Sequence, residues 1–311
     1  MDTPVSPSSS DPQRSATIGV AYAASAYLAW GLFPLYFRAV RHVPATEILA
    51  HRVAWSVVFL ACVLTFRRGW GSLHPARLRG NWGVFAATAS LLSLNWLLYI
   101  WAINNGQVLQ ASLGYFITPL VNVVLGVLVL GESLSRAQRA AVALAALAVA
   151  YQVVGAGTVP WISLALAVTF GLYGLLRKRL LVDAVPALLL ETLLMLPFAA
   201  AWMGWTAWSG GVAFAQGDPR ADLFLVGTGV VTTIPLLCFA QGARRLRLTT
   251  IGLLQFIAPT CQFFLAVLVF GEAFTSTHAV MFTLIWVAVG VYVVDTVRRV
   301  MGAATSPQQR V

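Results

Sequence analysis

Charged residues are scarce in this chain of 311 residues, of which only 10% are charged and 59% are hydrophobic. A soluble globular domain carries roughly 25% charged residues, because its water-facing surface must be polar. The composition therefore excludes a water-soluble enzyme, a nucleic-acid-binding module and a secreted disulfide scaffold. At ~20 apolar residues for each membrane crossing, the chain can supply about ten transmembrane helices and has no room for a separate soluble domain.

Cysteines and catalytic motifs are also few. The three cysteines, Cys62, Cys238 and Cys261, each lie within an apolar run, without CxxC spacing or a neighbouring histidine. This pattern disfavours a disulfide framework or a zinc site and predicts buried free thiols. HExxH, Walker A, nucleophile-elbow and dinucleotide-binding motifs are absent, and the chain has only ten acidic residues. We therefore expect neither an enzyme nor a cofactor nor a bound metal.

Apolar runs dominate what is present. They predict ten transmembrane helices, over residues 18–37, 46–66, 82–103, 108–130, 137–155, 160–176, 185–207, 222–243, 248–270 and 278–297. Only GAGTVP separates the fifth run from the sixth, which predicts a tight turn with Pro160 opening the next helix. The Pro/Ser-rich residues 1–17 and the last residues, 300–311, are expected to be tails, the first of them disordered.

The basic residues predict the orientation of these helices. With the N-terminus inside, 16 of the 20 Lys and Arg residues fall in inner segments, whereas Arg38, Arg41 and Arg220 fall outside and Arg52 lies within a helix. Cytoplasmic loops carry such an excess of Lys and Arg, so both termini are predicted to be cytoplasmic. The net charge of +10 therefore reports contact with the inner leaflet of a bilayer and not binding to nucleic acid.

The sequence also contains an internal repeat. LQASLGYFITPLVNVVLGVLVLGE (109–132) aligns with TTIGLLQFIAPTCQFFLAVLVFGE (249–272), with ten of 24 positions identical. The two halves, 18–155 and 156–299, each hold five helices, and an odd number means that the second half enters the membrane from the opposite face. The fold expected is thus an all-α integral membrane protein with ten transmembrane helices arranged as two inverted five-helix repeats. Such repeats are typical of secondary transporters with a midplane site.

This inverted repeat, with Gly-Glu closing the fourth and ninth helices, resembles the EamA family of the drug/metabolite transporter superfamily. The segments AWGLFPLYFRAVRHVPATEILAHRVAWS (29–56) and NWLLYIWAINNGQVLQASLGYFITPLVNV (95–123) are similar to the RarD-type permeases. The resemblance covers residues 18–299. It implies a permease of the bacterial inner membrane, usually an exporter, with a central cavity lined chiefly by helices one, three, four, six, eight and nine. It implies no particular substrate.

Polar residues and a proline share one helical stripe in each half: Tyr115, Pro119 and Asn122 in the fourth helix, and Gln255, Pro259 and Gln262 in the ninth. Each proline frees the carbonyl four residues earlier. We expect these stripes to line the cavity and the prolines to act as bending points. Hydrogen bonding between neighbouring helices is the alternative interpretation.

Three more residues are cavity candidates. Asn95 and Tyr99 lie deep in the third helix and share one face, and Trp30 lies midway along the first helix. Trp30 either lines the pathway or packs between helices. An aromatic and amide lining without a fixed central charge suits neutral or zwitterionic solutes better than inorganic ions.

Ionisable residues inside the predicted helices mark candidate gates. Glu47 and His51 lie four residues apart and could pair, although Glu47 is expected to extend its carboxylate to the interface. Arg52 and Glu191 should differ in depth by about 13 Å, so each is expected to serve a gate in its own half instead of a shared salt bridge. Two more acids, Glu132 and Glu272, follow Gly131 and Gly271 and are interpreted as structural turns.

These features together predict a secondary transporter that moves a small organic metabolite or drug-like solute by alternating access. Its partners would be the solute and the bilayer. Proton coupling would use Glu191 or Glu47, although nothing in the sequence requires it. A passive solute channel is the alternative, because the polar stripes would also suit a pore. A membrane-embedded enzyme would need clustered His or acidic residues at one interface, and the sequence has none.

Overall fold

The computed structural model describes residues 12–73, 80–131, 133–177, 180, 182–246 and 248–305, and its regular elements over these ranges are all helical. Nine helical segments are long and apolar enough to cross a membrane, and a tenth apolar helix, Trp161–Arg177, has 17 residues. At 1.5 Å per residue that helix is about 25 Å long, close to the shortest length that spans a bilayer. The prediction of an all-α membrane protein is confirmed.

The helices follow the order of the predicted runs. The long ones are α1 (Pro12–Arg38), α2 (Ala45–Phe66), α4 (Trp82–Asn104), α5 (Val108–Leu130), α6 (Arg136–Ala156), α7 (Trp161–Arg177), α8 (Ala184–Trp208), α9 (Pro219–Ala243) and α12 (Ser276–Thr305). A short 3₁₀ turn, η1 (Gly69–Leu73), follows α2. The ninth crossing consists of three pieces, α10 (Leu248–Leu254), α11 (Ile257–Phe264) and the π-helical turn η2 (Leu265–Val269).

Both ends of the chain are more helical than expected. α1 already begins at Pro12, within the predicted tail, because proline is favoured in the first turn of a helix. α12 continues to Thr305, since the residues after position 299 include Met and Ala, which are strong helix formers. The earlier part of the predicted N-terminal tail, residues 1–11, lies outside the described residues.

Glycines end the helices where the sequence places them. Gly131 after α5, Gly157 after α6 and Gly271 after η2 all have φ of 66°, the left-handed conformation that glycine adopts at a helix C-terminus. The turn at Gly157 confirms that the fifth and sixth apolar runs form two helices, α6 and α7. Position 132, the site of the first acidic turn residue, lies outside the described residues.

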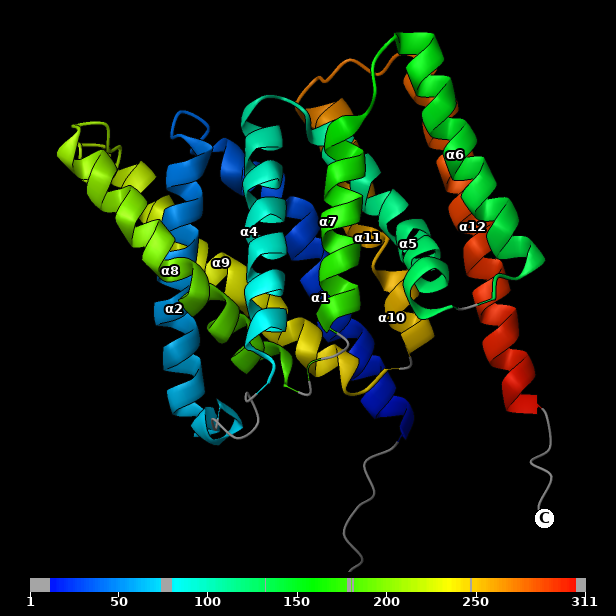
Figure 1. Ribbon diagram of the computed structural model, residues 1–311, viewed down its shortest axis with the longest axis horizontal. Helices are drawn as coiled ribbons and strands as arrows, with labels where there is room; N and C mark the ends of the chain where they lie inside the picture. The colour runs from blue at the N-terminus through cyan, green and yellow to red at the C-terminus, as the bar shows by residue number, and fades with distance from the viewer. Residues whose placement is uncertain are drawn as a thin grey trace, which may run out of the picture.

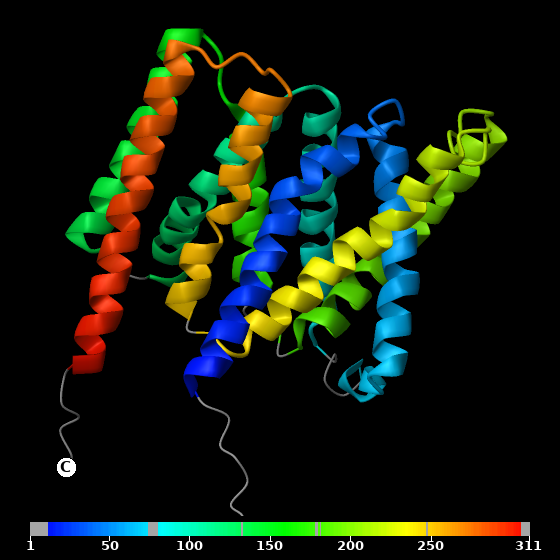
Figure 2. The same cartoon turned by 180° about the vertical axis from the view of Figure 1, so that it is seen from behind.

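The helices form one bundle with a pair at its side. α6 packs along α12, and the central helices α1, α4, α5, α7 and α11 lie between that pair and the group of α2, α8 and α9 (Figure 1). Seen from behind, α9 crosses both α1 and α2 (Figure 2). The start of α1 and the end of α12 lie at the same face of the bundle.

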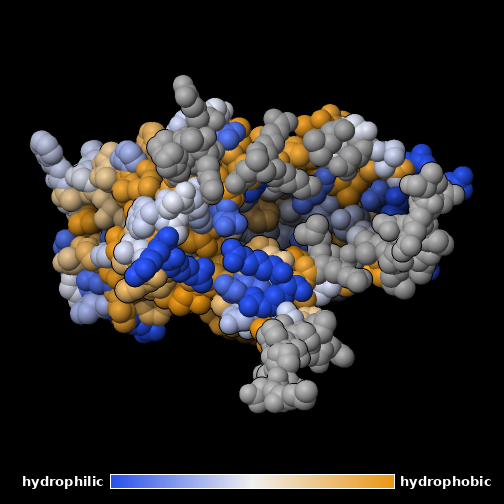
Figure 3. Space-filling model, turned by 90° about the horizontal axis from the view of Figure 1, so that it is seen from below, coloured by the Kyte–Doolittle hydropathy of each residue, from blue (hydrophilic) through white to orange (hydrophobic). Residues whose placement is uncertain are grey.

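That face carries many of the basic residues. The helix ends that lie there hold Arg67, Arg68, Arg136, Arg139, Arg177, Arg244, Arg245, Arg298 and Arg299. In a view onto this face, strongly hydrophilic residues gather beside apolar ones (Figure 3). Most of the described basic residues thus lie at one end of the bundle.

The outer surface between the two faces is apolar. Phe66, Val154 and Phe198 are each more than three-quarters exposed, as expected of side chains that face lipid. The expectation of buried thiols is wrong for Cys62, which is exposed because this side of α2 points outward; Cys238 and Cys261 are half-buried. All three thiols are free.

Candidate functional site

Arg52 of α2 is the centre of a buried cluster. Its side chain is only 4% exposed, and its Nε donates a hydrogen bond to the Thr232 hydroxyl of α9 at 3.0 Å. The guanidinium carbon lies 3.9 Å from the centroid of the Trp96 ring of α4. The rings of Phe37 and Phe33 on α1 lie 5.5 and 5.7 Å away. We call Phe33, Phe37 and Trp96 the aromatic cage of Arg52.

A close crossing of α2 and α9 puts Arg52 beside Thr232. A Cβ at Gly229 would clash with the Trp55 carbonyl oxygen, so the two backbones meet there without an intervening side chain. Arg52 lies three residues before Trp55, and Thr232 lies three residues after Gly229. The crossing therefore brings one turn of each helix into contact, and the contacts between Arg52 and Thr232 follow from it.

The charge of Arg52 has no counter-ion among the residues that the structure describes. None of the ion pairs found there includes Arg52, and its Nη1 is buried without a hydrogen-bond partner. Buried charges are normally paired, because an unpaired ion loses its hydration without compensation. Cation–π contact with Trp96 offsets only part of that cost. The guanidinium therefore lacks a compensating negative charge in the described part of the chain.

Two of the predicted cavity tyrosines lie at this cluster. Tyr99 and Tyr115 pack edge to face at 5.7 Å, and Tyr99 also packs edge to face against Phe37 of the aromatic cage, with centroids 6.3 Å apart. The Tyr99 hydroxyl is buried without a hydrogen-bond partner, whereas the Tyr115 hydroxyl makes a long bond of 3.5 Å to Asn95 Oδ1. The charged Arg52 therefore lies close to aromatic residues that were expected to line a cavity without a fixed charge.

Asn95 connects the cluster to α7. Its Nδ2 donates to the Leu166 carbonyl at 3.1 Å and to the Thr169 hydroxyl at 2.9 Å, and the side chain is 1% exposed. These bonds hold α4 against α7, which is the helix-bonding use of asparagine in membranes. Asn95 therefore positions Tyr115 through its Oδ1 and is itself fully engaged.

The predicted residues of the ninth crossing lie in a second cluster. Gln262 is 2% exposed, donates from Nε2 to the Trp30 carbonyl at 3.2 Å and leaves its Oε1 without a partner. The Trp30 ring packs against Tyr27 and Phe239, with centroids 5.4 and 5.7 Å apart. Trp30 is thus a packing aromatic whose backbone carbonyl binds Gln262.

The remaining stripe residues are less buried. Asn122 is exposed and lies beside Gly171 of α7, and Gln255 is half-buried where α10 ends. No hydrogen bond joins Asn122 to any residue that the structure describes. The structure therefore separates the predicted stripes, with Tyr115 beside Tyr99 and Asn95, Gln262 beside Trp30, and Asn122 in neither cluster.

The two prolines have different surroundings. Pro119 lies inside α5, which is continuous from Val108 to Leu130. Pro259 lies in the first turn of α11, and the helix breaks at Gln255, the residue whose carbonyl the proline leaves free. Ser112 of α5 donates a hydrogen bond to the Pro259 carbonyl at 2.8 Å and thereby ties the broken crossing to the continuous one.

Glu191 of α8 is completely buried and has partners. The Tyr173 hydroxyl donates to its Oε2 at 3.2 Å, and Arg177 Nε lies 4.0 Å from its Oε1. Both partners come from the last turns of α7. No ion pair with Arg52 is found in the described residues, as the expected difference in depth requires.

Glu47 does not extend to the interface, so that expectation is wrong. It is 1% exposed, and its Oε1 accepts hydrogen bonds from the backbone amides of Ala213 at 2.8 Å and Phe214 at 3.1 Å. The loop between α8 and α9 folds over the start of α2 and buries the carboxylate. His51 instead accepts a hydrogen bond from Trp55 Nε1 at 3.3 Å.

Glu272 has the structural role that the sequence indicates, but toward a different helix. Its two carboxylate oxygens accept hydrogen bonds from the amides of Val108 and Leu109, at 2.7 and 2.8 Å, and so cap the start of α5. Burial raises the pKa of Glu272, while the two amides and the nearby Arg38 lower it. The carboxylate thus joins the end of the ninth crossing to the start of the fourth.

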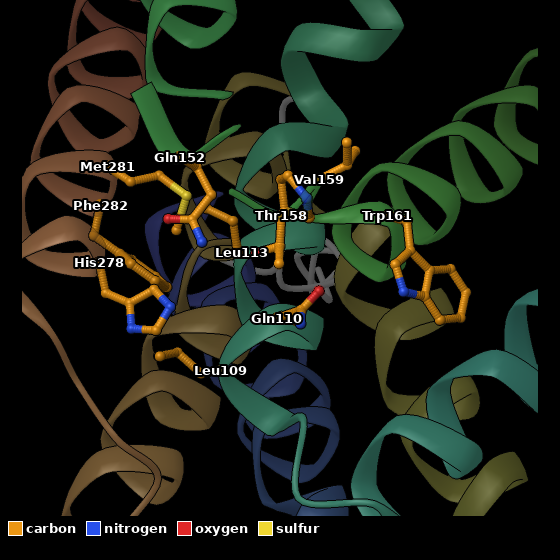
Figure 4. Close-up of a pocket in the computed structure, with 11 residues that line it drawn as sticks. Leu109, Gln110, Leu113, Gln152, Thr158, Val159, Trp161, His278, Met281 and Phe282 are labelled. Carbon is orange, nitrogen blue, oxygen red and sulfur yellow. The ribbon is translucent and has the colours of Figure 1, made fainter. Parts of the chain in front are cut away.

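A hollow of about 430 Å³ lies apart from these clusters, between α5, α6, α7 and α12 (Figure 4). Gln110, Gln152 and His278 are polar residues among its walls, and Phe282 and Trp161 are aromatic ones. Gln152 is 6% exposed and its Oε1 has no partner. Its one signal in the sequence is a single glutamine within an apolar run, which is not among the predicted site residues.

The aromatic cage and Thr232 were also missed. Phe33, Phe37 and Trp96 resemble ordinary apolar residues of a membrane helix, and Thr232 is one of several threonines in α9. Their role depends on contacts between α1, α2, α4 and α9. No local sequence pattern reports those contacts.

Comparisons with known proteins agree on the class of protein. The EamA-like transporter family matches residues 17–153. A protein of Vibrio cholerae named as a transporter is 49% identical over 287 residues, which cover 91% of this chain and 94% of that protein. Protein RarD of Escherichia coli is 44% identical over 281 residues, covering 90% and 95%.

A solved crystal structure shows that the fold is shared. It is 21% identical to this chain, covers 88% of it and 96% of its own length, and has a TM-score of 0.57. At this level of identity the similarity concerns the fold alone. Together with the full-length relatives, however, the family match is decisive: the chain belongs to the EamA-like transporter family, as a RarD-type membrane permease.

Proposed function

We propose that this protein is a secondary transporter that moves a small organic solute across the bacterial inner membrane by alternating access. The observation that carries the proposal is the buried Arg52, which meets side chains of α1, α4 and α9 within the membrane-spanning part of the bundle. Ionisable residues at such depth mark solute or ion pathways, because their burial is costly. Family membership supports the same class of activity.

Two inverted repeats, residues 18–155 and 156–299, would supply the two conformations. In such a repeat α1 corresponds to α7, α4 to α9, and α5 to α11. The contacts of α1 with α9 and α11 should therefore have counterparts between α7 and both α4 and α5, and all of these contacts occur. The α6–α12 contact and the α2–α8 contact each join two corresponding helices, so each contact is its own counterpart. This packing supports the repeat, and inverted repeats allow a site to open to either side by rocking.

We further propose that both termini are cytoplasmic and that the direction is export. The basic helix ends gather at the face where α1 begins and α12 ends, which supports a cytoplasmic position for that face. Export follows the direction that the family resemblance implies. Proton coupling is no part of the proposal, since Glu191 is held by Tyr173 and Arg177, and Glu47 holds a loop.

Flux measurements test the transporter proposal. The purified protein is reconstituted into liposomes, and efflux and uptake are followed for a broad panel of metabolites and drug-like solutes. We expect saturable, solute-specific flux that empty liposomes lack. Absence of specific flux in both directions across the panel would contradict the proposal.

Cysteine accessibility separates a transporter from a channel. Single cysteines replace Asn122 and Gln262 in a variant from which Cys62, Cys238 and Cys261 have been removed. Asn122 is exposed in the present conformation and Gln262 is 2% exposed, so their labelling should differ and should change in opposite directions when solute is added. Simultaneous labelling of Gln262→Cys from both sides of the membrane would favour a passive channel.

A further inference from the structure

We infer that the transported solute carries a carboxylate on a flat apolar body, and that Arg52 binds this carboxylate. The inference rests on the proposed function, because it names the substrate class of the same site. Four features of the site lead to it: an uncompensated charge, unused hydrogen-bond donors, aromatic walls, and the contrast with Glu191, a buried ion that lies beside a cation.

The first feature is the charge. Arg52 is 4% exposed, its only hydrogen bond goes to the neutral hydroxyl of Thr232, and no carboxylate pairs with it in the described residues. A guanidinium keeps its positive charge under all physiological conditions and cannot escape the cost of burial by losing a proton. An anionic group that entered the site would provide the missing counter-charge.

The second feature is a set of unused donors. Among the residues that the structure describes, Arg52 Nη1 and the Tyr99 hydroxyl are buried without a partner, and so is the hydroxyl of Ser56, one turn beyond Arg52 on α2. The Thr233 hydroxyl, adjacent to the Thr232 that binds Arg52, is also buried and unused. A carboxylate offers two acceptor oxygens with four lone pairs and accepts bidentate bonds from a guanidinium. These donors are thus of the type that a carboxylate oxygen accepts from.

The third feature is the aromatic wall. The Trp96 ring centroid lies 3.9 Å from the guanidinium carbon, Phe33 and Phe37 lie farther out, and Tyr99 packs against Phe37. Aromatic faces and edges pack well against flat apolar groups. A single guanidinium balances one negative charge, which favours a monocarboxylate over a phosphate, whose charge is higher. The site therefore suits an aromatic monocarboxylate.

The fourth feature is the contrast with Glu191. That carboxylate already receives a hydrogen bond from Tyr173 and lies 4.0 Å from Arg177. Its charge is therefore already compensated by a nearby cation, although its Oε1 accepts no hydrogen bond in the described part of the chain. Only Arg52 combines deep burial, a permanent charge and the absence of a counter-ion in the described part of the chain.

Matched acid and amide pairs test the inference on the purified full-length protein. The thermal unfolding of detergent-solubilised protein is measured with benzoate, phenylacetate and indole-3-acetate, and with the neutral amide of each. We expect at least one acid to raise Tm and to bind saturably, while its amide does not. Arg52→Gln should weaken that binding roughly tenfold to a hundredfold, as loss of a charge-assisted hydrogen-bonding partner implies.

Two further variants keep the test decisive. Arg52→Lys retains the charge and should retain part of the binding, even if Arg52→Gln proves unstable. Glu191→Gln is the matched control and should bind the acid as the wild type does. Equal binding of acid and amide, unchanged binding by Arg52→Gln, or the absence of binding by every acid would overturn the inference.

The outcomes also separate the inference from the proposed function. Binding of the acid without any flux in liposomes would contradict the transporter proposal and support the anion site at Arg52. Specific flux of neutral solutes that is unchanged in Arg52→Gln would support the transporter proposal and contradict the anion site at Arg52.

Discussion

Arg52 and Glu191 are buried ions in opposite halves of the molecule, and their surroundings differ. Glu191 has a hydroxyl donor, Tyr173, and a cation, Arg177, whereas Arg52 has aromatic faces and one neutral hydroxyl. A buried ion with partners contributes to the fold, and removing one partner is costly. An ion without a counter-ion is available to a ligand. Burial alone therefore does not distinguish a structural ion from a binding site, whereas the presence or absence of a counter-ion does.

The largest effect should follow from removing the charge at Arg52. Arg52→Gln is expected to reduce the flux of the bound carboxylate by about a hundredfold, because one charge-assisted interaction is lost where no other cation can replace it. Arg52→Lys should keep measurable flux with a raised KM. Initial rates in proteoliposomes, normalised to the amount of reconstituted protein, measure both. Wild-type rates for Arg52→Gln would remove the distinction between the two ions.

The next effect concerns stability and belongs to Glu191. Glu191→Leu leaves the Tyr173 hydroxyl without its acceptor and removes the anion beside Arg177, so it should lower stability by about 1–3 kcal/mol. Glu191→Gln keeps an acceptor oxygen and should cost less. Thermal unfolding measures the difference, and acid binding to Glu191→Gln should equal that of the wild type. A large loss of binding in Glu191→Gln would mean that both ions serve the solute.

A smaller effect should come from the residue that orients Arg52. Thr232→Val removes the 3.0 Å bond to Nε and should weaken acid binding by about 1 kcal/mol, or roughly fivefold. Thr232→Ser retains the hydroxyl and serves as the control. Titration of each variant with the acid gives the comparison. Identical affinities for the valine and serine variants would show that the bond does not orient the guanidinium.

The smallest effect should distinguish two tyrosines. Tyr99→Phe removes a hydroxyl that has no partner here, so Tm without ligand should hardly change, while acid binding should weaken roughly threefold to fivefold. Tyr173→Phe removes the donor to Glu191 and should lower Tm without changing acid binding. Measuring Tm and affinity for both variants completes the comparison. A lower Tm for Tyr99→Phe together with weaker acid binding by Tyr173→Phe would contradict the roles assigned to Arg52 and Glu191.

Much of the fold could be predicted from the sequence, because apolar runs and turn glycines are local signals. The separation of α6 from α7 at Gly157 followed from six residues. The broken ninth crossing was only partly predictable. Pro259 and Pro119 free equivalent carbonyls, yet only the chain before Pro259 breaks. The difference depends on the packing of each helix, which a comparison of aligned residues does not contain.

The site could be predicted residue by residue but not as an assembly. Arg52, Tyr99 and Tyr115 are noticeable as polar or aromatic residues at unusual depth. Thr232 and Trp96 gain their meaning only from the crossing of α2 with α9 and from the position of α4. Glu47 was misjudged for the same reason, since the loop that buries it lies more than 160 residues away in sequence.

The most direct test is an experimental structure of the protein with the bound acid. We expect the carboxylate oxygens to lie about 2.7–3.2 Å from Arg52 Nη1 and the Tyr99 hydroxyl, which is the range of charge-assisted and ordinary hydrogen bonds. The aromatic body of the acid should lie against Trp96 or Phe37. An acid bound in the hollow beside Gln152, or bound in the centre with its carboxylate away from Arg52, would contradict the assignment of Arg52 as the carboxylate-binding residue.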